Sequence, residues 1–234
     1  MGRKLYGTSK KQKGPRNDPP DKASEHRTEM DSHADQCCVG DNAHIFYHWP
    51  GITVEVGPFL SSLGCIPSAP IVTAGVTYDD PSTGRPILII IHQAIYIKGL
   101  KQNLLCPMQL RHNGITVNER PKHCTPHPTR EDHLIRFEEG DYFILLSIKG
   151  VTSYFPTRTP CTAEVQEFKE GGDYLELTSD SSEWDPHSTC FSDLESGLVD
   201  RYGEIREDVF TDVRRLFVTL TERDLYDPFR KIDI

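Results

Sequence analysis

The chain has 234 residues, a mass of 26.6 kDa and a formal net charge of −9, from 26 Lys and Arg against 35 Asp and Glu. This acidic balance argues against a nucleic-acid-binding surface along the whole chain. No apolar run approaches the roughly 20 residues that cross a bilayer, and the amino-terminal segment lacks the apolar stretch of a secretory signal. The composition therefore predicts an intracellular, cytoplasmic protein that is not secreted, has no membrane partner and keeps its seven cysteines reduced.

The charge is distributed unevenly along the chain. Residues 1–30 carry 8 Lys and Arg against 4 acids, residues 31–160 carry 10 against 12, and residues 161–234 carry 8 against 19. The arm over residues 1–27 is rich in Pro, Lys, Asp and Gly, so it cannot bury enough apolar surface to offset the entropy of ordering, and we predict that it is disordered. A solvated linker is the simplest interpretation of this basic arm, and weak contact with nucleic acid is the alternative.

Residues 28–158 show the pattern of a β-domain, in which short strands are broken by Gly, Pro and Asp turns. The second strand of the first hairpin is apolar at successive positions, which indicates burial on both faces. A proline at a first helical position and a following Asn-Gly pair predict one short helix. In chain order we expect strands at 52–56, 71–78, 86–91 and 94–97, the helix at 107–111, a strand at 115–117, and a second hairpin from 133–137 and 142–148. This pattern predicts a mainly β fold, as a compact barrel or sandwich.

The last third of the chain differs in composition. Residues 159–192 are predicted to form a mostly irregular acidic spacer, and Thr178–Thr189 within it reads as a loop or disordered linker. Residues 193–234 are predicted to form an amphipathic helical tail, because apolar residues recur at gaps of three and four as far as Leu220. We expect this face to dock on the chain's own domain. Gly203 costs such a helix about 1 kcal/mol relative to alanine and marks a point where it can break.

One short motif carries chemistry. Asp31, Ser32, His33 and Ala34 follow a short predicted strand, and an Asp followed by a small hydroxyl residue and an Ala is the layout of an aspartic protease loop. Two such carboxylates held close together share one proton, so that one can accept a proton from water while the other polarises a carbonyl. A tetrapeptide of this kind also occurs by chance in turns, so the motif needs support from elsewhere in the chain.

A second segment about 70 residues downstream supplies that support. Residues 96–110 follow the pattern Y-x-x-G-L-x-x-N-L-L-x-x-x-Q-L, and its central positions are Gly99, Leu100, Asn103, Leu104 and Leu105. Together with the aspartyl motif, this segment resembles the retropepsin-like aspartic protease domain of Ty1/copia-type retrotransposon polyproteins. Over roughly residues 28–190 the resemblance implies a small closed β-barrel with one short helix, in which the second segment packs beneath the aspartyl loop.

The resemblance also implies an activity. It implies an aspartic endopeptidase that cleaves polyprotein peptides, in the cytoplasm or within a virus-like particle, and needs neither a cofactor nor a metal. The chain has one aspartyl motif, so an active site requires a homodimer in which each copy contributes one Asp31. Asp31 then activates water, Ser32 braces the two loops, and Ala34 packs the loop.

His33 departs from the family pattern, which has glycine at this position. Glycine permits a backbone course and a close approach that a side chain can block. If the loop keeps its shape, the imidazole can donate a hydrogen bond to the carboxylate pair or shift its pKa. If the loop does not, the chain is a catalytically inactive, retrotransposon-derived dimerisation or interaction module.

Metal binding and cysteine chemistry are the rival interpretations. His44 and His48 are four residues apart, as are His123 and His127, but the chain has no C-x-x-C pair, so we expect no metal site. With seven Cys and ten His, no pair stands out as a nucleophile and its base. We expect the adjacent Cys37 and Cys38 to point to opposite faces of a strand and to behave as small apolar residues.

Overall fold

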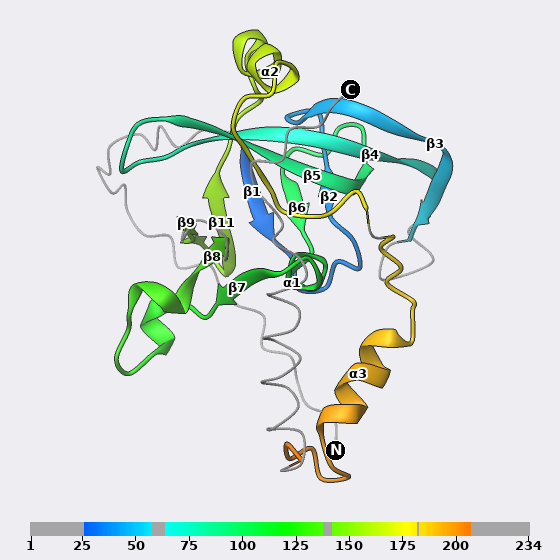
Figure 1. Ribbon diagram of the computed structural model, residues 1–234, viewed down its shortest axis with the longest axis vertical. Helices are drawn as coiled ribbons and strands as arrows, with labels where there is room; N and C mark the ends of the chain where they lie inside the picture. Colours follow the sequence, from blue (N-terminus) through cyan, green and yellow to red (C-terminus); the bar gives the residue numbers. More distant parts are fainter. Residues whose placement is uncertain (1–25, 58–63, 138–141, 182, 207–234) are drawn as a thin grey trace, which may run out of the picture.

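Figure 1 shows the computed structural model of the chain, which describes residues 26–57, 64–137, 142–181 and 183–206. The predicted basic arm lies outside these residues up to position 25, and the predicted helical tail lies outside them beyond position 206. The described chain is mainly β, as predicted. None of its helices has the length and apolarity that a membrane-spanning helix requires.

Twelve strands, three α-helices and two short 3-10 helices are described. The strands are β1 (Arg27–Met30), β2 (Cys38–Val39), β3 (His44–Val56), β4 (Ile66–Asp79), β5 (Pro86–Tyr96), β6 (Asn103–Leu105), β7 (Ile115–Glu119), β8 (His133–Phe137), β9 (Tyr142–Leu145), β10 (Ser147–Lys149), β11 (Thr152–Pro156) and β12 (Tyr174–Glu176). The helices are α1 (Pro107–His112), α2 (Thr162–Lys169) and α3 (Cys190–Leu198), and the 3-10 turns are η2 (Lys122–Cys124) and η3 (Arg130–Asp132).

The described strands form two open sheets. The larger has the order β10-β11-β1-β6-β2-β5-β4-β3, with β12 paired to β5, and the smaller has the order β7-β8-β9. The closed barrel implied by the resemblance is not found among these residues, because the path of the larger sheet ends at β10 and at β3 and the strands of the smaller sheet pair only with one another. In the larger sheet, β1 and β6 run parallel, which brings the start of the aspartyl motif beside the N-L-L segment.

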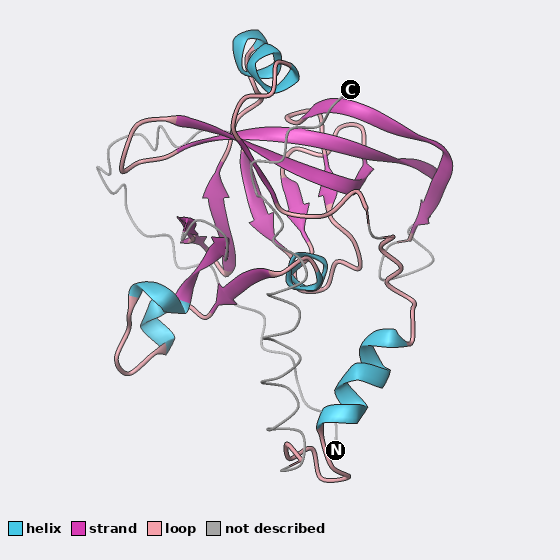
Figure 2. Cartoon of the chain, viewed as in Figure 1, coloured by secondary structure: helices cyan, strands magenta, loops and turns pink. Residues whose placement is uncertain are grey.

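One core cluster joins the two sheets. It combines Ile89 of β5, Ile135 of β8, Leu110 of α1 and Phe155 of β11, each of which is fully buried. Helix α2 lies above the ribbon of β3, β4 and β5, and α1, which contributes Leu110 to the core, lies below it (Figure 2). Burial of this apolar surface is the main driving force for the fold.

The predicted hairpins and the short helix are confirmed, except that the strand predicted over 142–148 is two strands, β9 and β10, which belong to different sheets. β4 and β5 pair antiparallel across the 80–85 turn, and β8 pairs antiparallel with β9. β5 is buried on both faces, as its unbroken apolar sequence predicts, because Ile89 and Ile91 join the main core while Leu88 and Ile90 face a separate cluster. Helix α1 begins at Pro107, where the missing N–H costs nothing.

The prediction of a separate strand over 94–97 is wrong. Residues 94–96 continue β5 through a β-bulge, in which His92 and Gln93 together oppose Thr73. Gln93 has φ +52°, and it is the only non-glycine residue with a positive φ in the described part of the chain. A side chain in this conformation costs on the order of 1 kcal/mol. The bulge was missed because it interrupts the apolar pattern at two polar positions.

The acidic segment after residue 158 packs on the domain instead of leaving it as a spacer. β12 pairs in parallel with β5, and Phe168 of α2 packs on Phe46 of β3 and on Tyr174, with ring centroids 4.7 and 4.9 Å apart. Trp184 is 8% exposed and belongs to the main core. The high content of Ser, Asp and Glu hid these few apolar anchors.

The amphipathic helix predicted from residue 193 is interrupted within its described part, close to the point where Gly203 was expected to break it. Helix α3 ends at Leu198, and the chain then turns around Gly203, whose φ is +82°. The expected docking face is not packed on the domain either, since Leu194 and Tyr202 are 65% and 73% exposed. The glycine and the adjacent Asp200, whose carboxylate accepts backbone N–H groups of the turn, favour the turn over the helix.

Arg158 fixes the start of α2 to the β4–β5 ribbon. Its guanidinium donates to both carboxylate oxygens of Asp79 at 2.9 Å and to both oxygens of Glu164, at 2.5 and 2.9 Å. Glu164 also accepts hydrogen bonds from Thr77 and from the backbone of Cys161. The Arg158 hydrogen bonds, ahead of the other contacts, lower the pKa of Glu164 to about 2.

We therefore expect Glu164 to make stability depend on acidity. Its carboxylate form is favoured in the folded state. Its contribution to the free energy of unfolding is therefore complete above its ordinary pKa of 4.5 and is lost as the pH falls toward 2. Glu164→Gln should remove this part of the pH dependence of the free energy of unfolding, measured by urea denaturation between pH 2 and 7. Glu167→Gln, at an exposed position of the same helix, is the control and should keep it. Equal pH profiles for wild type and Glu164→Gln would contradict the assignment.

Candidate functional site

The aspartyl loop, defined here as residues 31–36, begins where β1 ends. The backbone N–H of Asp31 donates to Leu105 O at 2.9 Å, which continues the parallel pairing of β1 with β6. Within the loop, His33 N donates to Asp31 Oδ1 at 3.0 Å and Ala34 N donates to Asp31 O at 3.2 Å. The Asp31 carboxylate is therefore half-buried and held in a fixed orientation at the end of the strand.

The side chain of Asn103 joins the two sides of the aspartyl loop. Asn103 is fully buried; its Nδ2 donates to Thr28 Oγ1 at 3.2 Å, and its Oδ1 accepts the backbone N–H of Gly40 at 3.1 Å. Thr28 Oγ1 lies in turn 2.9 Å from Thr157 Oγ1 of the neighbouring chain segment. One amide thus connects β1, before the loop, to the chain after β2.

The other residues of the second motif surround this amide. Gly99 has φ +83° and donates its N–H to Asp41 Oδ2 at 3.0 Å, and Leu100 packs so closely that a Cβ added at Gly40 would lie 1.9 Å from Leu100 O. Leu105 is fully buried in the main core. Leu104 packs on a different group of buried residues, called here the second cluster, which consists of Cys38, Ala69, Ile71 and Ile95. All five positions named from the sequence therefore contact or support the segments that flank Asp31.

Helix α1 holds the chain where it leaves the loop. The buried Gln109 accepts the backbone N–H of Cys37 through Oε1 at 2.8 Å, and Cys106 N donates to Cys37 Sγ at 3.3 Å. Cys37 lies in the main core and Cys38 in the second cluster, so the two side chains point to opposite faces as predicted.

The remaining loop side chains face different surroundings. Ala34 packs against the main core, whereas Ser32 and His33 are exposed, with Ser32 Oγ 3.5 Å from His33 Nδ1. His33 does not have a positive φ, so a residue with a side chain fits this backbone without strain. Within one copy of the chain, the departure from glycine leaves the loop intact.

A groove of about 910 Å³ opens beside Asp31. Its floor is the second cluster, with Trp49, Val54, Ile71, Ile95 and Leu104 among the lining residues. Its acidic lining consists of Asp31, Asp35, Glu55, Asp180, Glu183 and Asp185. His33 and His187 also line it, and no Lys or Arg does so among the described residues. An apolar floor with carboxylates around it suits an extended peptide and repels a polyanion.

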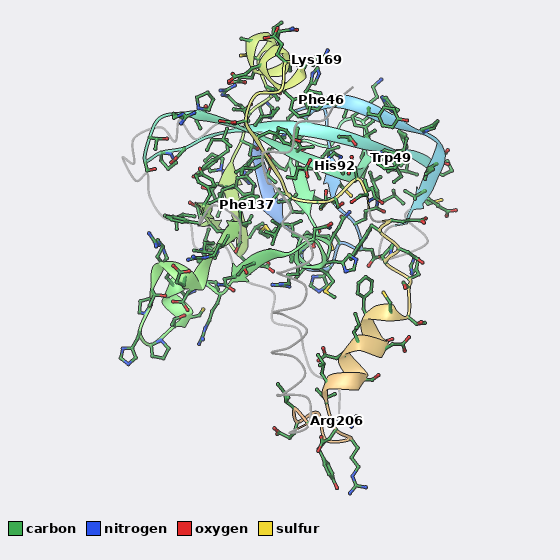
Figure 3. The ribbon with its side chains drawn as sticks, viewed as in Figure 1. Phe46, Trp49, His92, Phe137, Lys169 and Arg206 are labelled. Carbon is green, nitrogen blue, oxygen red and sulfur yellow. The ribbon has the colours of Figure 1, made fainter. Side chains whose placement is uncertain are left out.

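A hydrogen-bonded chain ties the groove wall to the acidic segment, and two of its members, Trp49 and His92, are labelled in Figure 3. Trp49 Nε1 donates to Thr73 Oγ1 at 3.2 Å, and this hydroxyl lies 3.1 Å from His92 Nδ1. His92 Nε2 lies 3.3 Å from Glu176 Oε1. Because a carboxylate oxygen of Glu176 can only accept, the imidazole proton in this contact lies on Nε2. This chain links β3, β4, β5 and β12.

Burial makes three of the cysteines poor nucleophiles. Burial raises the pKa of Cys38 to about 11 and also raises the pKa of the Cys37 and Cys106 thiols, so all three stay protonated at neutral pH. Cys65, Cys124, Cys161 and Cys190 are exposed. In the described part of the chain, no three His, Cys, Asp or Glu side chains come together as a metal site.

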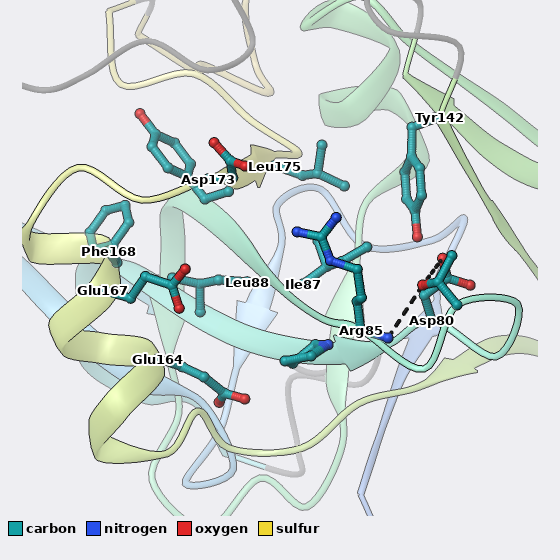
Figure 4. A pocket seen from close by; sticks show the side chains of 13 residues that line it. Asp80, Arg85, Ile87, Leu88, Tyr142, Glu164, Glu167, Phe168, Asp173 and Leu175 are labelled. Atoms are coloured by element: carbon teal, nitrogen blue, oxygen red, sulfur yellow. Dashed lines mark hydrogen bonds between the residues drawn. The ribbon is translucent and has the colours of Figure 1, made fainter.

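A second, smaller pocket lies away from the aspartyl loop (Figure 4). It has a volume of about 320 Å³ and lies between α2, β12 and the β4–β5 turn. Arg85 and the carboxylates of Glu167 and Asp173 line it, and the phenol of Tyr142 points to Asp80. It contains none of the motif residues.

The sequence analysis missed two residues of the site, Gln93 and Trp184. Trp184 Nε1 donates to Asp35 O at 2.9 Å, and Gln93 O accepts from Gln36 Nε2 at 2.5 Å, so both hold the aspartyl loop. Trp184 could have been identified, because a tryptophan in a polar stretch is more often an anchor than a linker residue. Gln93 had no comparable signal.

No protein-family model, curated protein or solved structure matches this chain. The site is therefore interpreted from its own geometry and from the motif residues.

We predict that removing the Asn103 amide destabilises the whole site. Asn103→Ala leaves the buried Gly40 N–H without its acceptor and should lower the free energy of unfolding by about 2–4 kcal/mol, measured by urea denaturation. Asn118→Ala is the matched control, because its amide donates to Glu131 O at the surface, and it should cost less than about 1 kcal/mol. Equal losses in the two variants would show that the Asn103 bridge has no special role.

Proposed function

We propose that this chain is a retropepsin-like aspartic endopeptidase, active as a homodimer, that cleaves the peptide bonds of a retrotransposon polyprotein. One observation carries the proposal: the two motifs, about 70 residues apart, meet through the Asn103 amide beside an open groove that Asp31 lines. The parallel pair β1 and β6, with α1 beneath the loop, is also the part of the fold on which we base a retropepsin-like assignment.

The chemistry requires two copies of Asp31. In the dimer one carboxylate is ionised and the other protonated, because like charges at this distance cannot both ionise. The ionised carboxylate accepts a proton from a water molecule, whose oxygen attacks the scissile carbonyl carbon while the protonated carboxyl donates to the carbonyl oxygen. Collapse of the tetrahedral intermediate breaks the C–N bond, and the amine leaves with a proton from the carboxyl pair.

The exposed part of the loop is suited to meet a second copy. Ser32 and His33 are both exposed at the turn that follows Asp31, and the hydroxyl of Ser32 is free to brace the partner loop. The apolar floor of the groove supports a peptide as the ligand, and its carboxylates disfavour nucleic acid.

We expect Asp31→Asn to abolish cleavage. Asparagine keeps the size of the side chain but cannot accept the proton of water, so the rate should fall about 1000-fold or more. The measurement is mass spectrometry of a peptide library incubated with the concentrated chain, with and without an inhibitor of aspartic proteases. Wild-type activity per chain should rise with protein concentration, because the dimer is the active form.

Asp193→Asn is the control for this substitution, since Asp193 is an exposed residue of α3 outside the groove. It should cleave as the wild type does. Cleavage that survives Asp31→Asn, or that the inhibitor leaves unchanged, rules out the proposed function.

His33 is the observation that favours a second candidate, an inactive dimerisation or interaction module. Its imidazole is exposed on the face where the second loop has to approach. Because the backbone at His33 is unstrained, we expect wild type and His33→Gly to cleave the same peptides with rates within about tenfold of each other. Activity in the glycine form alone would instead establish the inactive module.

A further inference from the structure

The acidic segment after β12 crosses the back of the aspartyl loop. We call residues 177–181 and 183–187 the C-terminal strap. Leu177 N donates to Ile90 O at 3.0 Å, and Thr178 Oγ1 donates to His92 O at 2.8 Å. Ser179 N donates to Asn113 Oδ1 at 3.0 Å, at the end of α1. The strap is therefore fastened to both β5 and α1 before it reaches the loop.

Gln93 connects the strap to the loop. Its side chain bonds the strap twice, since Oε1 accepts Trp184 N at 2.9 Å and Nε2 donates to Ser179 O at 2.8 Å. Its backbone oxygen accepts Gln36 Nε2 of the aspartyl loop. The left-handed backbone at Gln93 orients its side chain toward the strap and its carbonyl oxygen toward Gln36, and this accounts for a bulge at this point of β5.

Trp184 completes the connection. Its indole N–H donates to the carbonyl of Asp35 at 2.9 Å. The ring is held by His112 and Phe191, with centroids 5.6 and 5.3 Å away. Asp35 lies between the two points where the rest of the domain fixes the loop, at Asp31 through β6 and at Cys37 through α1. The middle of the loop is thus held from the strap.

We propose that Trp184 is a positioning residue for Asp31, and that the C-terminal strap belongs to the functional unit although it follows the β-domain. This inference rests on the proposed function. The hydrogen bond from the Trp184 indole to the carbonyl oxygen of Asp35 fixes the position of the loop. The strap also lines the same groove as Asp31. Loss of this bond therefore changes the geometry of the carboxylate more than the binding of a peptide.

The test compares two variants of the full chain. Trp184→Phe keeps a ring in the core but removes the indole N–H. Phe168→Leu is the control, because it loosens aromatic packing on Phe46 and Tyr174, away from the aspartyl loop. For Trp184→Phe we expect kcat to fall roughly fivefold to tenfold, with KM within twofold of wild type. Phe168→Leu should retain the wild-type kcat. Hydrogen–deuterium exchange of residues 33–36 should become faster in Trp184→Phe only.

An unchanged kcat in Trp184→Phe, or an equal fall in Phe168→Leu, overturns the inference, because a general loss of packing would affect both variants. If the wild-type chain shows no cleavage that depends on Asp31, the proposed function fails. The hydrogen-exchange comparison then decides alone: equal exchange in the two variants shows that Trp184 does not hold the loop, and faster exchange in Trp184→Phe shows that it does.

Discussion

The buried amide of Asn103 is the interaction on which the rest of the site depends. A fully buried amide without partners is costly, and here both ends of Asn103 are used, one on Thr28 and the other on the backbone of Gly40. These partners lie on opposite sides of the aspartyl loop. The parallel register of β1 with β6, and the close packing of Gly40 on Leu100, are the conditions that let one side chain reach both. The position of Asp31 follows from them.

Much of the fold could be predicted because its signals are local. The turn at 80–85 and the apolar run of β5 specify a hairpin buried on both faces, and Pro107 specifies the start of α1. The site could be predicted as far as its residues belong to the two motifs. The bridge that Asn103 forms across the loop could not be predicted from the sequence. The spacing of a motif shows which residue types stand at which positions, but not which backbone groups their side chains reach.

The failures have a common physical cause, which is that a few single residues decided the local structure. Phe168 and Trp184 draw an otherwise polar segment onto the domain, although its average composition is that of a linker. In the predicted tail, the regular spacing of apolar residues favours a helix, yet Asp200 and Gly203 form a turn whose local hydrogen bonds end it. Average composition and periodicity give equal weight to every residue, whereas packing depends on single anchors.

The balance of energies at Gln93 indicates what the bulge in β5 is for. Glycine at this position would remove a strain on the order of 1 kcal/mol. The glutamine side chain makes two hydrogen bonds to the strap, each with a net worth of roughly 1 kcal/mol. The two bonds outweigh the strain by roughly 1 kcal/mol, so glutamine is also more stable than glycine at this left-handed position. The side chain's distinctive effect is geometric: it holds Trp184 where the indole N–H meets the carbonyl of Asp35.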